Sequence, residues 1–410
     1  MKRGYLSEYF EGIAAKTLSA VEANTVRSNQ HEFNGVESLK KLFGHGSTRV
    51  EFPARFVYLD ETDDEPVAET GFVTWYDARA RSGGRTGRSE HRLYFPTTRA
   101  SLCASEGDLL VLGKRQDGRV LAVIAPGGST TANQLRWLFG LDDVSHPGFS
   151  VRAELESERD RIGFASRLIL EEIGVQIELH ADTYLETLLK KFEGKFPTTR
   201  VFSAYTREML PEANALKEPD AALMAFMERE EILFRTLERY LLANRLGEGF
   251  VGKDGADVDG FVSYSLSVQN RRKSRVGFAL ENHLEFVLSQ QGIRYVRAPV
   301  TERGCKPDFL FPGASEYHDT AFPAEKLAML ASKSTCKDRW RQILSEADRI
   351  ETKHLLTLET SISENQTREM DAQKVRLVVP ESLHRTFNHQ QQAWLLDVAE
   401  FVALVKRRQG

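Results

Sequence analysis

Three side chains in the second half of the sequence have types and an order suited to hydrolysis of a phosphodiester. Asp308 stands directly before an apolar run, Lys333 ends the next apolar run, and Glu346 follows one helix later. Two carboxylates can hold Mg²⁺, which takes few protein ligands and keeps several waters. A lysine beside them can stabilise charge on a phosphate or lower the pKa of a metal-bound water. The three residues together therefore favour metal-assisted cleavage of a nucleic-acid backbone.

Each of these residues also has an ordinary structural explanation. Asp308 follows Pro307 and could form a turn, Lys333 could extend to solvent from a strand end, and Glu346 could be an exposed acid. Glu281, on a helix with apolar neighbours, either leans over the same cleft or faces water. The combination favours a metal site, because clustered carboxylates repel one another unless a cation offsets their charge.

The composition describes a globular protein long enough for two domains. The chain has 410 residues, of which 41% are hydrophobic and 28% charged, and its net charge is −4. Glu8 and Glu11 interrupt the N-terminal segment, so it lacks the apolar core of a signal peptide, and no membrane span is visible. We read all three cysteines as free thiols of a reducing compartment. We therefore expect a cytoplasmic protein with no membrane contact.

The first half of the sequence predicts short strands. Aromatic and β-branched residues recur between Gly, Pro and Asp turns, and Asp117-Gly118 between two apolar runs is a hairpin signal. A closed or half-closed β-barrel is the expected outcome. The predicted strands lie at 49–59, 70–77, 90–96, 108–115 and 119–126.

From about residue 153 the sequence changes to long helical segments and then to alternating helices and strands. The alternation predicts a mixed sheet sandwiched by helices, in a second domain that begins near 183. We therefore expect an α+β protein with domains at 1–182 and 183–410. The predicted elements of the second domain are helix 276–291, strand 308–312, strand 327–333, helix 337–350, strand 354–359, strand 375–380 and helix 390–407.

Five blocks of this second domain resemble the catalytic domain of the EcoRII family of type II restriction endonucleases. They are NRRKSRVGFALENHLE at 270–285, KPDFLFP at 306–312, EYHDTAFP at 316–323, STCKDRWRQILSEADRI at 334–350 and VRLVVP at 375–380. The resemblance implies the α/β/α fold of PD-(D/E)xK nucleases, a Mg²⁺ cofactor and double-stranded DNA as substrate.

The sequence departs from the simple form of that nuclease motif. Ala331 stands two residues before Lys333, where an acid is usual. A related subgroup that reads CC and GG base steps has this acid on the following helix, where Glu346 stands. By resemblance, Asp308 and Glu346 would hold the metal and Lys333 would assist the water. Glu281 and Tyr317 would complete the site.

A charged triplet directly after the predicted lysine could read DNA bases. Arginine suits the two acceptors of guanine, and aspartate accepts from the amino group of cytosine. The triplet Lys337-Asp338-Arg339 begins a predicted helix and could instead be ordinary helix-start charge, although Lys337 and Arg339 are poorly placed for that role. The resemblance implies a CCWGG-like site, with Arg229 as a weak candidate for a pocket that holds an extruded base.

Two basic segments are candidates for contacts with DNA phosphates. The first is Arg271-Arg272-Lys273-Ser274-Arg275, which could otherwise be a solvated loop. The second is a Gly-rich stretch of the first domain that carries Arg79, Arg81, Arg85, Arg88 and Arg92, and its alternative is a solvated hairpin loop.

The first domain is more weakly similar to the N-terminal domain of the same family, a DNA-binding pseudobarrel. That similarity implies an effector domain that binds a second copy of the recognition site. The implied effector contacts are Arg88, Glu90, His91, Arg92 and His31.

Together these features predict a Mg²⁺-dependent type II restriction endonuclease that acts as a homodimer, because a near-palindromic site calls for two-fold symmetry. One alternative is a DNA-binding regulator whose nuclease-like half does not cleave. A repair or recombination nuclease of the same fold is a third, which the base-reading triplet disfavours.

Overall fold

The computed structural model describes residues 2–28, 30–46, 48–63, 65–79, 90–141, 144, 148–177, 182–252 and 255–410, and leaves the side chains at 26, 27, 164, 182, 183, 337 and 338 undescribed. The chain divides into two compact units. The N-terminal unit comprises 1–177, 360–364 and 385–388, and the C-terminal unit comprises 178–359, 365–384 and 389–410. The predicted division at 182/183 into an effector part and a nuclease part stays a prediction.

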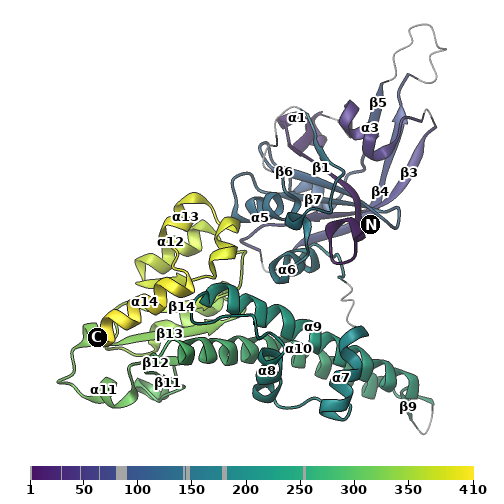
Figure 1. Ribbon diagram of the computed structural model, residues 1–410. Helices are drawn as coiled ribbons and strands as arrows, with labels where there is room; N and C mark the ends of the chain where they lie inside the picture. The colour runs from purple at the N-terminus through teal and green to yellow at the C-terminus, as the bar shows by residue number, and fades with distance from the viewer. Residues whose placement is uncertain are drawn as a thin grey trace. The chain divides into compact units, whose positions relative to one another are not determined.

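The N-terminal unit is built on a curled eight-stranded sheet (Figure 1). Its order is β2-β5-β4-β3-β7-β6-β1-β8, and its neighbours pair antiparallel except β3 with β7, which are parallel. Within the described residues no pairing joins the end strands β2 and β8, so closure into a barrel stays a prediction. The strands are β1 (Phe10–Thr17), β2 (Glu32–Gly35), β3 (Val50–Tyr58), β4 (Val67–Asp77), β5 (His91–Tyr94), β6 (Leu109–Arg115), β7 (Val120–Ala125) and β8 (Ser150–Arg152).

Both faces of this sheet are buried, because alternate residues of a strand point to opposite faces. In β6, Leu109 and Val111 belong to one hydrophobic cluster, which also contains Leu135 and Ile169 of the helices that cover that face. The intervening residues of β6 and β7 pack instead against β2, β4 and β5, where Trp75 is fully buried. Burial on both faces explains why β7 is apolar at every position.

Short helices complete this unit, and its sequence prediction was partly right. The Asp117-Gly118 turn joins β6 to β7 as predicted, with Gly118 at φ 79°. The long helix expected from 153 is wrong, since buried Asp160 binds Arg152 and the backbone at Ile162 bonds to Gly4. The helices are α1 (Ala20–Ala23), α2 (Thr25–Ser28), α3 (Glu37–Phe43), α4 (Arg99–Leu102), α5 (Thr130–Phe139) and α6 (Phe164–Glu172), with 3-10 turns at Leu6–Glu8 and Glu158–Asp160.

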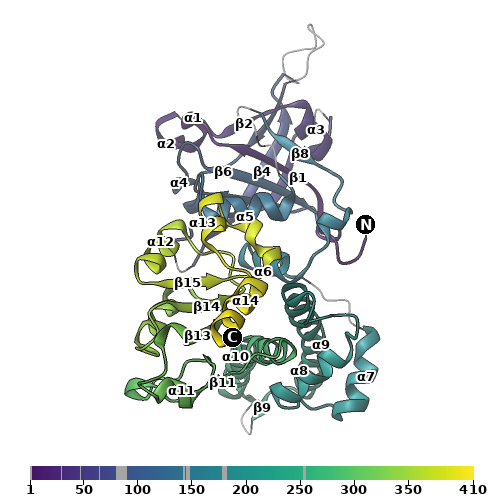
Figure 2. The same ribbon diagram turned by 60° about the vertical axis from the view of Figure 1, so that its left-hand side comes forward.

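The C-terminal unit contains a five-stranded mixed sheet of order β11-β12-β13-β14-β15 (Figure 2). The pairs β11/β12 and β12/β13 are antiparallel, and β13/β14 and β14/β15 are parallel. Parallel pairing brings the ends of β13 and β14 to one edge of the sheet. The strands are β11 (Val296–Arg297), β12 (Phe309–Phe311), β13 (Ala328–Lys333), β14 (Lys353–Thr357) and β15 (Val375–Val378).

Two long helices, α9 (Pro219–Glu248) and α10 (Val258–Gln290), lie side by side and are joined by the small hairpin β9 (Val251–Gly252) and β10 (Gly255–Ala256) (Figures 1 and 2). Phe401 of α14 (Val398–Gln409) contacts Phe311 and His354 of the sheet. No helix within the described ranges is long and apolar enough to cross a membrane. The remaining helices are α7 (Asp182–Phe192), α8 (Thr199–Glu208), α11 (Ala314–His318), α12 (Glu364–Ala372) and α13 (His389–Trp394), with 3-10 segments η3 (Glu302–Gly304), η4 (Ala324–Lys326), η5 (Lys337–Ser345) and η6 (Glu381–Thr386).

The predicted strands of this unit are present, but three predicted helices differ. Helix 276–291 is the end of the much longer α10, so the basic run 271–275 is helical rather than a loop. The C-terminal helix is divided into α13 and α14. Helix 337–350 is the 3-10 segment η5, which ends at Ser345, and Glu346 follows it with extended backbone at φ −91° and ψ 140°.

Candidate active site

Asp308 and Lys333 meet at the ends of two neighbouring strands. Asp308 precedes β12 and Lys333 ends β13, and the two strands pair antiparallel with Phe309 opposite Leu330. The carboxylate Oδ2 of Asp308 accepts a hydrogen bond from the Ser332 amide at 2.7 Å and one from Lys333 Nζ at 3.2 Å. Both side chains are less than one-fifth exposed. The structure therefore brings together the first two predicted site residues.

Glu346 belongs to the same cluster. Burial, and next the negative charge of Asp308, raise the pKa of Glu346 to about 7, while Lys333 and Lys353 act in the opposite direction. Its Oε2 atom is buried and has no hydrogen-bond partner among the described residues. A buried carboxylate oxygen without a partner is costly unless a proton or a cation meets it.

Glu281 of α10 interacts electrostatically with Asp308 and Lys333 of this cluster. Its Oε2 atom lies 2.6 Å from Nη2 of Arg297 in β11. Burial raises the pKa of Glu281, and the Arg297 hydrogen bond offsets part of that rise. The charges of Asp308 and Lys333 also act on it. Glu281 thus lies close to the cluster, but its negative charge is already balanced by the ion pair with Arg297.

These residues fit a single hard divalent cation with few protein ligands. Within the described parts of the chain, no group of three or more His, Cys, Asp or Glu side chains forms a metal site. Two carboxylates are nevertheless enough for Mg²⁺, which retains water ligands. The partnerless oxygen of Glu346 and the neighbouring carboxylate of Asp308 are donors of the type that Mg²⁺ prefers.

Tyr317 is buried and holds the chain segment around Glu346 rather than touching the cluster. Its hydroxyl donates to Glu302, whose two oxygens lie 2.7 Å and 2.6 Å away. Glu302 also accepts from the Asp348 amide at 3.2 Å. Burial would raise the pKa of Glu302, but the Tyr317 hydroxyl and the Asp348 amide hold it below its usual value. Tyr317 and Glu302 therefore fix the backbone two residues after Glu346.

The predicted base-reading triplet begins the 3-10 segment η5. Arg339 is exposed, whereas the side chains of Lys337 and Asp338 lie outside the described part. The segment is anchored on both sides of the triplet, because the Cys336 amide donates to Glu359 and the side chain of Trp340 is buried. The triplet therefore starts four residues after Lys333, on a backbone that is anchored on both sides.

Arg275 is not available for phosphate, which corrects one prediction. It is 6% exposed and its guanidinium lies 3.0 Å from Glu230 and 3.5 Å from Glu231, over the ring of Phe234. Arg272 is paired with Glu238 at 2.7 Å but remains partly exposed.

Arg229, the candidate for a base pocket, stacks over Tyr184 of α7 at 5.1 Å. Arg271 lies over the ring of Phe196. The roles predicted for both residues stay predictions.

In the N-terminal unit, His91 is also buried and is a second correction. It is 3% exposed, its ring stacks on Trp75 at 5.1 Å, and Nε2 lies 3.1 Å from the Gly46 carbonyl. DNA cannot reach it while the sheet is folded.

The other predicted effector residues have different surroundings. Arg92 binds Glu90 and Glu32, and Arg79 binds the second oxygen of Glu90. His31 packs beside Phe95 at 5.9 Å. Arg81, Arg85 and Arg88 lie outside the described residues.

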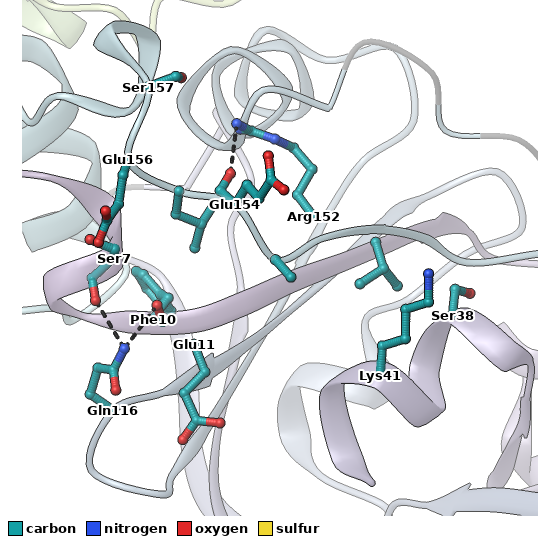
Figure 3. A pocket seen from close by; sticks show the side chains of 13 residues that line it. Ser7, Phe10, Glu11, Ser38, Lys41, Gln116, Arg152, Glu154, Glu156 and Ser157 are labelled. Carbon is teal, nitrogen blue, oxygen red and sulfur yellow. Dashed lines mark hydrogen bonds between the residues drawn. The ribbon is translucent and has the colours of Figure 1, made fainter. Parts of the chain in front are cut away.

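A pocket of about 930 Å³ in the N-terminal unit contains none of the predicted site residues (Figure 3). Its polar groups largely satisfy one another, as the Gln116 amide donates to the carbonyls of Ser7 and Phe10 and Arg152 donates to Phe139. Its two bases, Lys41 and Arg152, share the lining with three acids, Glu11, Glu154 and Glu156. None of the lining side chains has a buried polar atom without a hydrogen-bond partner among the described residues, so the pocket does not define a ligand.

Comparison with known proteins supports the resemblance seen in the sequence. Residues 234–402 match the family model described as EcoRII C terminal. The Type II restriction enzyme EcoRII of Escherichia coli is 46% identical over 187 residues, which are 45% of this chain and 45% of that relative. The match thus spans less than half of the relative's length. Residues 234–402 of this chain are therefore similar to the C-terminal domain of EcoRII.

Two solved structures are also similar to this chain. Metal-depleted Ecl18kI in complex with uncleaved, modified DNA has a TM-score of 0.45 and 19% identity, covering 56% of this chain and 85% of that one. A PspGI–substrate DNA complex has a TM-score of 0.43 and 16% identity, covering 52% of this chain and 93% of that one.

Sequence reasoning missed three residues that support the site: Arg297, Glu302 and Lys353. Lys353 is buried and its ammonium donates to the carbonyls of Ala347 and Ile350. A lysine at the start of an apolar strand is a weak signal of such a role. Arg297 and Glu302 gave no signal, because their partners are defined only by the fold.

Proposed function

We propose that this chain is a type II site-specific deoxyribonuclease that hydrolyses double-stranded DNA at a CCWGG-like sequence with Mg²⁺. The observation that carries the proposal is the contact of Asp308 with Lys333 beside the partnerless carboxylate oxygen of Glu346. These residues lie within the segment that matches the EcoRII C-terminal family. The named activity of the E. coli relative supports the choice of reaction and substrate.

In this mechanism Asp308 and Glu346 would hold the cation, which when bound polarises the phosphate and lowers the pKa of its water. The Ser332 amide keeps the Asp308 carboxylate in place, so the strand backbone orients one ligand. Lys333 places a positive charge next to that carboxylate, where it can stabilise negative charge on the phosphate. Arg297 offsets the charge of Glu281 and so limits repulsion of the DNA backbone.

Substrate recognition completes the proposal. Arg339 and its two neighbours would read G·C pairs in the major groove, and Arg271 and Arg272 would contact phosphates. Arg229 would line a base pocket. The N-terminal unit would bind a second DNA copy through Arg88, Arg92 and Glu90, with His31 beside them, and two copies of the chain would act on one site.

The first test is cleavage of a plasmid with several CCWGG sites in Mg²⁺, beside a matched plasmid without such sites. We expect discrete fragments from the first plasmid alone. Asp308→Asn should cleave at least about 100-fold more slowly, while it keeps an oxygen that can accept from the Ser332 amide. Glu325→Ala, which changes an exposed acid of the same unit, should cleave normally.

Binding measured in Ca²⁺ separates a chemical role of Asp308 from a structural one. Site binding and the far-UV spectrum of Asp308→Asn should match those of the wild type. Tight, specific binding by a wild-type protein that never cleaves would instead support the DNA-binding regulator.

A further inference from the structure

Lys353 is a buried cation whose side chain binds a single turn of the chain. It begins β14 and is 7% exposed. Its ammonium donates to the carbonyls of Ala347 at 3.2 Å and Ile350 at 3.1 Å. Among the described residues, no carboxylate lies within ion-pair distance of it. A buried charge is costly unless its hydrogen bonds are made, so the presence of a lysine here indicates that these two contacts have a role.

The turn that Lys353 binds follows Glu346 directly. The Ile350 amide donates to the Ala347 carbonyl at 2.9 Å, so Lys353 contacts the carbonyls at both ends of this turn. Ala347 has φ 50°, a left-handed backbone conformation that residues other than glycine rarely adopt. Such a conformation persists where the surrounding structure holds it. Lys353 therefore helps to hold a strained backbone one residue after a predicted metal ligand.

Within the described parts of the chain, three other side chains hold this turn, and all three accept from its amides. Lys353 differs from them because it donates to carbonyls and because it belongs to the sheet. Its strand, β14, lies beside β13 and pairs parallel with it, with His354 opposite Leu330 (Figure 2). Lys353 therefore fixes the turn to the strand next to the one that ends in Lys333. The three acceptors are Thr301 for the Ala347 amide, Glu302 for the Asp348 amide and Tyr317 for the Arg349 amide.

We propose that Lys353 is a positioning residue that sets the place of the Glu346 carboxylate beside Asp308, and thereby the affinity of the site for a divalent cation. The inference rests on the proposed function, in which these two acids hold Mg²⁺. Removal of a group that orients a metal ligand typically weakens metal binding by about 10- to 100-fold. Lys353 and Glu346 also lie close enough for their charges to interact. Burial raises the pKa of Glu346, and Lys353 is one of two lysines whose charge acts against that rise.

The contacts of Lys353 and its charge have opposite effects on cation binding. A positive charge near the site repels a cation, so removal of the charge alone would strengthen binding. Removal of the two carbonyl contacts instead frees the turn and displaces Glu346, which weakens binding. The direction of the change therefore separates a positioning role from an electrostatic one. A purely structural role would lower the fraction of folded protein and leave the affinity of the folded molecules unchanged.

Binding of Mn²⁺ to the full chain, measured by electron paramagnetic resonance, tests the proposal without cleavage. Lys353→Met keeps the apolar stem and removes the ammonium, and its dissociation constant for Mn²⁺ should rise at least about tenfold. Lys374→Met is the matched control, because the Lys374 carbonyl accepts from the Lys353 amide while its ammonium pairs with Glu351. This control should stay within about twofold of the wild type. An unchanged or lower dissociation constant for Lys353→Met, or a wild type that binds no Mn²⁺, would overturn the proposal.

The Mg²⁺ concentration that gives half-maximal cleavage is the second readout. In Lys353→Met it should rise at least about tenfold, while the rate at saturating Mg²⁺ falls by less than about threefold. Partial unfolding reduces the number of active molecules but not this concentration, so a less stable variant can still be compared. If Lys353→Met does not fold, Lys353→Gln replaces it, because its shorter side chain cannot reach both carbonyls; a wild-type affinity for Mn²⁺ in that variant would overturn the proposal. A wild type that binds Mn²⁺ but does not cleave would count against the proposed function alone, and the Mn²⁺ comparison would still decide this inference.

Discussion

At the scale of single residues, the two carboxylates of the cluster differ in their hydrogen bonding. Asp308 is held by a backbone amide and by Lys333, whereas an oxygen of Glu346 has no partner among the described residues. The apo protein therefore keeps a proton on Glu346 at higher pH than an ordinary glutamate would. Glu346 should therefore make the free energy of unfolding depend on pH.

Stability should reveal the unusual titration of Glu346. The folded protein retains its proton up to a pKa of about 7, while the unfolded chain releases it near 4.5. Between these values the folded state binds more protons, so raising the pH lowers the free energy of unfolding. Glu346→Gln removes this dependence and should stabilise the apo protein at pH 8 by about 1 kcal/mol after screening, with little effect near pH 4.5.

Thermal unfolding in EDTA at pH values from 5 to 8 measures this effect. The difference in Tm between Glu346→Gln and the wild type should grow as the pH rises. A difference that is independent of pH would mean that the Glu346 carboxyl is not the titrating group.

At the scale of elements, the sequence predicted where strands end. It did not predict which side chains pair with one another across the fold. Apolar runs bounded by charged residues located β12 and β13, and with them Asp308 and Lys333. The sequence could not show that Arg275 lies against Glu230, because 45 residues and the packing of α9 on α10 separate them. Glu346 was expected on a helix, but Ala347, at φ 50°, follows it where a regular helix cannot continue.

The 3-10 segment η5 should carry sequence specificity. Arg339→Ala should reduce discrimination at a G·C pair of the site by about 10- to 100-fold, because a bidentate contact to guanine would be lost. Arg341→Ala is the matched control, since Arg341 lies two residues further on the same segment and pairs with Glu369 at 2.6 Å. Cleavage rates on single-base-pair variants of the site make this comparison. Equal discrimination by both variants would remove Arg339 from base recognition.

At the scale of the whole molecule, the two units differ in how far known proteins resemble them. The C-terminal unit contains most of the segment similar to the EcoRII C-terminal family model and the acid–lysine cluster. The N-terminal unit has a double-sided core that the apolar strands predicted in part, although β1, β2 and β8 were missed. Its predicted DNA contacts were the least predictable feature, because burial of His91 depends on the neighbouring strand that carries Trp75.

Replacing Arg88 and Arg92 together by alanine should weaken activation by a second DNA site. We expect the cleavage rate of a two-site plasmid to fall toward that of a one-site plasmid, and the salt dependence of binding to decrease by about one to two phosphate contacts. Arg119→Ala, an exposed arginine in the β6–β7 turn, is the control. An unchanged preference for two sites would separate the N-terminal unit from effector binding.

The short connection between Lys333 and Arg339 has a consequence for where DNA would be cut. Asp308 holds one end of this connection and Glu359, just beyond β14, holds the Cys336 amide in its middle. Five residues therefore fix the distance between the residue placed beside the hydrolysed bond and the residue placed to read a base pair. In the proposed enzyme, the number of residues between Lys333 and Arg339 would therefore set the distance between the cut and the recognised base pair. Substitutions that weaken affinity elsewhere would lower the yield of cleavage without moving its position.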